Sequence, residues 1–141
     1  MILFDTSVLS RVFRRRRMGP EEQHVQAVVE ELMAGDVPLG LPGVVLQEVL
    51  SGVQSEKQFA DLERRLLASF SVLNPGTRDH VEAARLRNKC LAMGLAASGP
   101  DCLIASLAIA GNHELFAMDE DFRNLARHAP LKLFRVERGT K

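Results

Sequence analysis

The sequence lacks tryptophan and tyrosine, has only two cysteines, and carries no net charge. Without Trp or Tyr, stacking on nucleic-acid bases must use phenylalanine or arginine side chains. The 18 basic and 18 acidic residues cancel, so a nucleic-acid contact would need local clustering of charge. Cys90 and Cys102 form no CxxC pair, and the four histidines show no zinc-site spacing. A reducing compartment is therefore expected.

Long apolar runs are also missing. Asp5 interrupts the N-terminal apolar run after four residues, unlike a signal peptide. No stretch free of charged residues approaches the roughly 18 residues that a membrane span needs. We therefore expect a cytoplasmic protein that makes no membrane contact. The chain has 141 residues, 46% apolar and 26% charged, which predicts a single globular domain over residues 1–141.

Short apolar segments alternate with amphipathic ones along the chain. The expected strands cover residues 1–4, 37–41, 71–73, 115–118 and 131–136. The main expected helices cover residues 20–34, 42–50, 56–70, 78–93, 102–110 and 121–127. On the helix over 78–93, Val81, Ala84 and Leu91 share one face. This alternation predicts an α/β fold with a mainly parallel sheet of four to five strands between two helical layers.

Four acidic side chains occupy positions that such a fold could bring together. Asp5 and Asp119 follow the first and fourth expected strands, while Glu48 and Asp101 lie early in helices. In an open parallel sheet, binding sites form at the carboxyl ends of the strands. Residues far apart in the sequence could thus meet at one rim of the sheet.

Each of these four residues also has a purely structural interpretation. Asp5 and Asp119 could cap the helices that follow them. Asp101 forms a capping-box pattern with Ser98, and Glu48 could be an ordinary solvated helix residue. For any one of these four residues alone, the structural interpretation is at least as good as the functional one.

The surroundings favour a shared site. Asp101 precedes the apolar residues 102–105, and Glu48 is the only charge between Asp36 and Glu56. Charges isolated in apolar surroundings are usually paired or bound to metal. Two carboxylates 4 Å apart would repel by about 4 kcal/mol at an effective dielectric constant of 20. Hard divalent cations such as Mg²⁺ or Mn²⁺ would neutralise them.

Four motifs carry a resemblance to a known family. They read ILFDTS at residues 2–7, VLQEVL at 45–50, PDCLIA at 100–105 and DEDF at 119–122. In this order and spacing, they make the chain similar to PIN-domain ribonucleases, specifically the VapC-type toxins of bacterial toxin–antitoxin pairs. The resemblance covers nearly the whole chain and implies a PIN-like three-layer α/β/α sandwich.

The resemblance also implies a function and a site. The protein would be a metal-dependent endoribonuclease whose Asp5, Glu48, Asp101 and Asp119 hold one or two Mg²⁺ or Mn²⁺ ions. Asp121 would be a further ligand or an orienting residue, or only a favourable charge at a helix N-terminus.

Supporting hydroxyl groups are expected near these acids. Thr6 and Ser7 would assist the acidic residues or only cap the first helix. The family commonly has Thr or Ser two residues before the last motif, where this chain has Ala117. Thr6 and Ser7 could compensate for that missing hydroxyl.

Partners follow from the same resemblance. We expect an RNA substrate, a cognate VapB-type antitoxin that covers the acidic pocket, and a homodimer. The apolar stripes on the helices before Gly52 could supply the dimer interface. The basic residues Arg11, Arg14, Arg15, Arg16 and Arg17 could contact RNA or a protein partner, or form a solvated loop.

Other functions fit less well. A haloacid-dehalogenase-type phosphotransferase requires a second Asp where this chain has Ser7, and no P-loop or dinucleotide-binding motif occurs. A non-catalytic module whose acidic pocket holds a metal or a partner's arginine stays open as an alternative. Cys90 and Cys102 are expected in the core, and His113 at the surface.

Overall fold

The computed structural model describes residues 1–13 and 19–136, so Arg14, Arg15, Arg16 and Arg17 lie outside the described residues. Within these ranges, five strands form one parallel sheet in the order β3-β2-β1-β4-β5. The strands are β1 (Ile2–Phe4), β2 (Leu39–Pro42), β3 (Ser71–Leu73), β4 (Glu114–Phe116) and β5 (Lys132–Leu133). The predicted parallel sheet is confirmed, although the last strand is shorter than the apolar stretch 131–136 suggested.

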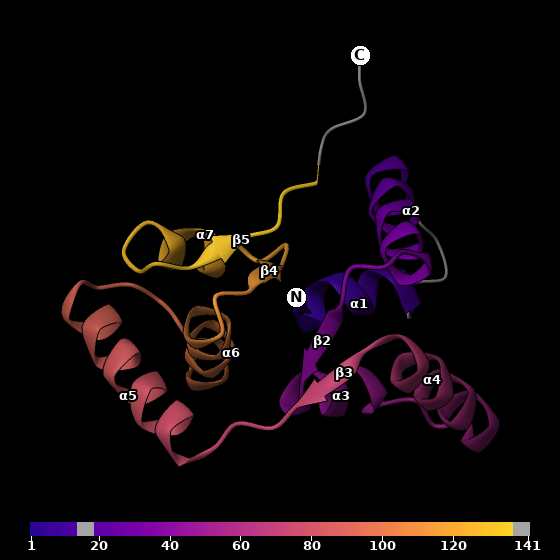
Figure 1. The fold of residues 1–141 in the computed structure, drawn as a ribbon, viewed down its shortest axis with the longest axis horizontal. Helices are drawn as coiled ribbons and strands as arrows, with labels where there is room; N and C mark the ends of the chain where they lie inside the picture. Colours follow the sequence, from indigo (N-terminus) through magenta and orange to yellow (C-terminus); the bar gives the residue numbers. More distant parts are fainter. Residues whose placement is uncertain (14–18, 137–141) are drawn as a thin grey trace.

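Helices cover both faces of this sheet. They are α1 (Thr6–Phe13), α2 (Pro20–Ala34), α3 (Gly43–Leu50), α4 (Glu56–Ser69), α5 (Thr77–Ala92), α6 (Gly99–Ala110) and α7 (Glu120–Ala126). Figure 1 shows α1, α2 and α4 on one side of the strands and α5 and α6 on the other. This arrangement confirms the predicted three-layer architecture. No helix of the described residues combines the length and apolarity needed to cross a membrane.

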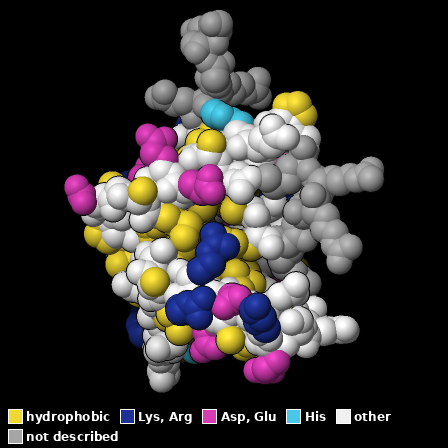
Figure 2. Space-filling model, turned by 90° about the vertical axis from the view of Figure 1, so that its right-hand side faces the viewer, with side chains coloured by type: hydrophobic (Ala, Val, Ile, Leu, Met, Phe, Trp, Pro, Cys, Tyr) yellow, Lys and Arg dark blue, Asp and Glu magenta, His cyan; other side chains and the backbone are white. Residues whose placement is uncertain are grey.

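The core is built around the central strand β1, whose three residues are all buried. The Phe4 ring packs edge-on against Phe70 at 4.9 Å and lies 5.2 Å from Phe116. Cys90 and Cys102 are buried free thiols, as predicted. On the side that carries α2 and α4, basic, acidic and hydrophobic side chains are interspersed, in keeping with the balanced charge (Figure 2).

Helix α5 differs from the expectation. The shared face of Val81, Ala84 and Leu91 is exposed to solvent. Ala83 and Cys90 are the buried residues of α5 instead. The helix packs closely against α6, and small side chains at a helix contact let two backbones approach each other. The expected face therefore stays free on the outside of the molecule.

Candidate active site

The site lies where the strand order reverses, between β1 and β4. Asp5 directly follows β1, and its backbone N–H donates to the carbonyl of Phe116, the last residue of β4, at 3.0 Å. Asp119 follows β4 after two further residues. Such a switch point in a parallel sheet leaves a crevice at the carboxyl ends of the strands, where ligands bind.

Three carboxylates converge at this edge. One oxygen each of Asp101, Asp119 and Asp121 lies within 4.8 Å of the other two, and all three residues are half-buried. Asp101 is in the first turn of α6, and its N–H donates to the Oγ of Ser98 at 3.2 Å. Asp119 caps α7 by accepting the N–H of Asp121 at 3.0 Å. Capping and clustering are thus compatible, because the capping bond itself brings these two acids together.

Asp5 is the most buried acid of the site, with 6% of its surface exposed. Its Oδ2 accepts bonds from the hydroxyl and the backbone N–H of Ser7, at 2.8 Å and 3.3 Å. Burial raises the pKa of Asp5 above its ordinary value, the bonds from Ser7 oppose that rise, and the charge of Asp119 adds to it. A buried, charged carboxylate of this kind calls for a positive partner.

The pKa of Asp101 shows how closely the acids gather. Burial, followed by the negative charges of Asp5, Asp119 and Asp121, raises this pKa from 3.8 to about 6. Carboxylates from the ends of two strands and the starts of two helices therefore act on one another. An all-oxygen donor set with this excess of negative charge fits a hard divalent cation such as Mg²⁺ or Mn²⁺.

Glu48 lies beside this cluster rather than within it. The side chain is exposed on α3 and accepts a hydrogen bond from the Thr6 hydroxyl at 2.8 Å. Its carboxylate oxygens, like those of Asp5, are not among those that lie within 4.8 Å of one another. Thr6 follows Asp5 directly, so this bond ties Glu48 to the start of α1, next to the most buried acid.

Ser7 joins the two strand ends of the site. Besides donating to Asp5, its Oγ accepts the backbone N–H of Met118 at 3.2 Å. Met118 neighbours Ala117, the position where a hydroxyl side chain was expected from the family pattern. Ser7 thus brings a hydroxyl group to the backbone beside Ala117 from the first turn of α1.

Replacing Ser7 with alanine is expected to weaken both the fold and the site. Asp5 would lose the bond from the hydroxyl and Met118 would lose an acceptor, which lowers the free energy of unfolding by about 1–2 kcal/mol. The pKa of Asp5 would rise further, since the bonds from Ser7 lower it.

Urea unfolding and a carboxyl NMR titration of Asp5 measure these effects. Ser51→Ala is the matched control, because the Ser51 hydroxyl donates to the Gln47 carbonyl at 2.6 Å on an exposed helix end. If the pKa of Asp5 were unchanged in Ser7→Ala, Ser7 would not stabilise the charged carboxylate of Asp5.

Of the remaining sequence candidates, Arg14, Arg15, Arg16 and Arg17 lie outside the described residues. Arg11 is half-buried in the last turn of α1. His113 lies at the surface with its side chain partly covered, and its Nδ1 lies 3.2 Å from the amino group of Met1. Burial and that neighbouring positive charge lower the pKa of His113. Met1 and Glu114, which follows His113, lie at the amino ends of β1 and β4, opposite the acids.

Comparison with known proteins finds solved structures of the same fold. FitAcB from Neisseria gonorrhoeae has a similar structure, with a TM-score of 0.74, 20% identity, and 96% of this chain and 97% of that chain covered. VapBC2 from Rickettsia felis, bound to a promoter DNA fragment, matches with a TM-score of 0.74 and 20% identity. The match covers 95% of this chain and 98% of that chain. A toxin–antitoxin complex from Klebsiella pneumoniae matches with a TM-score of 0.69 and 21% identity. The match covers 94% of this chain and 100% of that chain. At these identities, the structures show a shared fold.

No curated protein was found to match the sequence. The family model described as PIN domain matches residues 2–128. That span includes every strand of the sheet except β5 and all the acidic residues described above. The chain therefore belongs to the PIN domain family.

Proposed function

We propose that this protein is a metal-dependent endoribonuclease toxin of the VapC type. The observation that carries the proposal is the convergence of Asp101, Asp119 and Asp121 within 4.8 Å, at a strand-order switch in a PIN domain. PIN domains are generally nucleases. Structures of similar fold are described as VapBC and toxin–antitoxin complexes, which supports a toxin.

The acidic residues would hold the cation. We propose Asp5, Asp101 and Asp119 as ligands, directly or through water, with Asp121 beside them and Glu48 at the margin. A divalent cation in such a site activates water and stabilises charge on phosphate oxygens. Asp101 must be deprotonated to bind a cation, so its raised pKa predicts that cation affinity falls as the pH drops below about 6.

The chain's other residues would orient these ligands. Ser7 holds the carboxylate of Asp5, and Ser98 fixes the backbone of Asp101. Because Asp119 caps α7, its carboxylate is fixed relative to Asp121. These contacts pre-organise the oxygens before a cation or a phosphate arrives, so little rearrangement is needed on binding.

A non-catalytic module of the same fold is the alternative, in which the acidic pocket holds a metal or a partner's arginine without turnover. The two functions differ in one property, since only an enzyme converts many RNA molecules per protein molecule. Cation binding alone does not separate them.

RNA cleavage by the purified protein tests the proposal. We expect cleavage of RNA in Mg²⁺ or Mn²⁺, loss of that cleavage in EDTA, and recovery when the cation is restored. An Asp101→Asn preparation made in parallel reports any contaminating ribonuclease. Cleavage that persists in EDTA, or equal cleavage by both preparations, would rule out the metal-dependent mechanism.

Two kinds of protein partner are also proposed. The similar structures from Rickettsia felis and Klebsiella pneumoniae support a cognate VapB-type antitoxin. For the homodimer, the apolar stripes of α2 and α3 are only partly available, because Val25, Val29, Val45 and Val49 are buried while Val28 is half-buried. The exposed apolar residues Val81, Leu91 and Met93, on and just after α5, are better suited to contact a second copy.

A further inference from the structure

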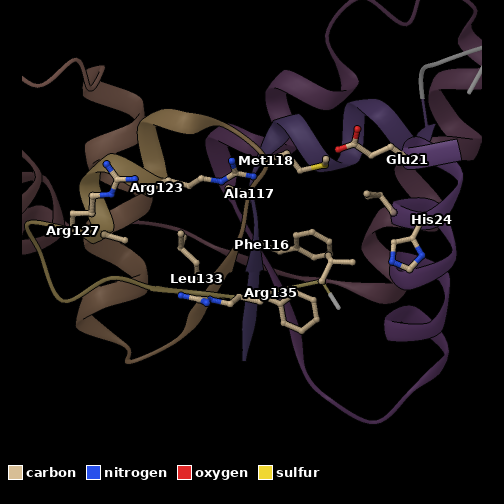
Figure 3. A pocket seen from close by; sticks show the side chains of 13 residues that line it. Glu21, His24, Phe116, Ala117, Met118, Arg123, Arg127, Leu133 and Arg135 are labelled. Atoms are coloured by element: carbon tan, nitrogen blue, oxygen red, sulfur yellow. The ribbon is translucent and has the colours of Figure 1, made fainter. Parts of the chain in front are cut away.

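A second concave surface opens beside the acidic cluster. It is a cavity of about 940 Å³ between α2, α7 and the residues that follow β5. Figure 3 shows Arg123 of α7 and Arg127, which directly follows α7, on one side, Glu21 and His24 of α2 on the other, and Phe116 between them. The cavity thus has one basic wall and an aromatic base.

Residues that line the cavity are next in the sequence to residues of the proposed active site. Ala117 and Met118 line it, and they directly precede Asp119. Arg123 lines it from α7, two residues after Asp121. A strand of nucleic acid whose phosphate reached the acids would therefore meet this cavity with its neighbouring nucleotides.

The basic wall carries charge that the protein leaves available. Arg123 lies in α7, Arg127 directly follows that helix, and Arg135 joins them from the segment after β5. Arg123 is paired with Glu120 at 3.0 Å in an exposed ion pair. Within residues 1–13 and 19–136, neither Arg127 nor Arg135 forms an ion pair. Guanidinium groups of this kind suit phosphate oxygens.

The base of the cavity offers an aromatic surface. Phe116 is buried, and Phe134 packs against it with ring centroids 4.9 Å apart and planes tilted by 39°. Phe134 itself is half-buried and lines the cavity, so part of its ring is accessible. In a chain without Trp or Tyr, such a ring is one of the few surfaces on which a base can stack.

We propose that this cavity binds the nucleotides of an RNA strand adjacent to the phosphodiester that is cleaved. Arg127 and Arg135 contact backbone phosphates, and Phe134 stacks on a base. The inference rests on the proposed ribonuclease function and adds to it the path of the substrate. Because the contacts are to phosphates and to a π-face, binding at this cavity tolerates different sequences.

The test measures RNA binding without cleavage. A short fluorescein-labelled single-stranded RNA is titrated with the Asp101→Asn protein, with and without Arg127→Ala and Arg135→Ala together. We expect the double replacement to weaken binding at least about tenfold. The slope of log affinity against log salt concentration should become shallower by about 1.4, at about 0.7 for each lost phosphate contact.

A matched control removes the same charge elsewhere. Arg64→Ala and Arg78→Ala together delete two exposed arginines of α4 and α5, each paired with an acid of its own helix. This variant should keep its affinity within about twofold and its salt slope unchanged. If the two double variants behave alike, the proposal is overturned.

RNA cleavage distinguishes this inference from the proposed ribonuclease function on which it rests. For this test, the arginine replacements are made in a protein that keeps Asp101. Suppose that the unaltered protein cleaves RNA in Mg²⁺ and that the Arg127/Arg135 variant cleaves and binds RNA equally well. The cavity is then not the substrate path, although the proposed ribonuclease function holds. In that case, loss of antitoxin binding by the variant would assign the cavity to the protein partner. If the unaltered protein cleaves no RNA, the proposed function itself fails.

Photocrosslinking checks the aromatic contact directly. RNA containing 4-thiouridine, irradiated on the Asp101→Asn protein, should form crosslinks to the peptide that contains Phe134. Phe134→Leu, which keeps most of the apolar volume, should weaken binding by at least about fivefold without loss of folding. Crosslinks confined to peptides away from the cavity would contradict the proposal.

Discussion

Replacing Asp101 with asparagine is expected to reduce RNA cleavage at least about a thousandfold, while making the cation-free protein more stable. The carboxylate is one of three whose oxygens lie within 4.8 Å of one another. Losing a ligand charge removes several kcal/mol of transition-state stabilisation in metal-assisted hydrolysis, and about 4 kcal/mol corresponds to this loss of rate. The fold survives, because the bond to Ser98 uses the backbone of residue 101.

The stability gained by the cation-free Asp101→Asn protein depends on pH in a predictable direction. Folding raises the pKa of Asp101 from 3.8 to about 6, so the folded state favours the protonated acid and loses stability as the pH rises through this range. A full shift of this size equals about 3 kcal/mol. Since Asp101 is only half-buried, solvent screening reduces the expected gain of Asp101→Asn to about 1 kcal/mol, or roughly 2–4 °C in Tm.

Thermal unfolding in EDTA measures this effect at two pH values. The gain should be complete near pH 8 and vanish near pH 4, where Asp101 is protonated in the unaltered protein. Asp36→Asn, at an exposed position before β2, should change Tm little at either pH. A destabilised Asp101→Asn protein at pH 8 would contradict the assignment of Asp101 to a repulsive cluster.

Phe4→Ala is expected to lower the free energy of unfolding by about 3–5 kcal/mol, the largest effect on stability that we predict. The Phe4 side chain is fully buried on the central strand and packs against the rings of Phe70 and Phe116. Truncation leaves a cavity that neighbouring strands cannot close. Because Phe4 precedes Asp5, activity should fall as well, even under conditions where the protein stays folded.

Urea unfolding of Phe4→Ala checks this prediction. Phe59→Ala is the control, since Phe59 is only half-buried on α4 and its truncation removes less apolar contact. Its loss should be clearly smaller, with the same dependence on urea concentration. Equal losses in the two variants would show that β1 is not the centre of the core.

The strand-to-helix order of the sequence was enough to place Asp5 and Asp119 at one edge of the sheet. Each acid follows an apolar strand directly or nearly so, and parallel strands bring such positions together. The sequence left open whether these residues cap helices or form a site, because both need a carboxylate at the same place. The bond from Asp121 to Asp119 shows that one geometry meets both requirements.

Other features depend on contacts that a linear pattern does not encode. The apolar face of α5 was recognisable, but whether it packs inward depends on α6, which instead contacts the smaller side chains on the opposite side. Glu48 was placed on the correct helix, yet the direction of its side chain is set by Thr6. The arginines of the second cavity are scattered over α7 and the residues after β5, where each resembles an ordinary surface charge.

The position of β1 has a consequence for synthesis of the protein. This strand is made before the other strands of the sheet, but it pairs with β4, whose residues are 114–116. On the ribosome, a nascent chain that has not yet reached this segment holds Asp5 without Asp119 or Asp121 opposite it. The complete set of charges therefore assembles only after residues 114–121 have emerged, so a shorter nascent chain lacks the proposed site.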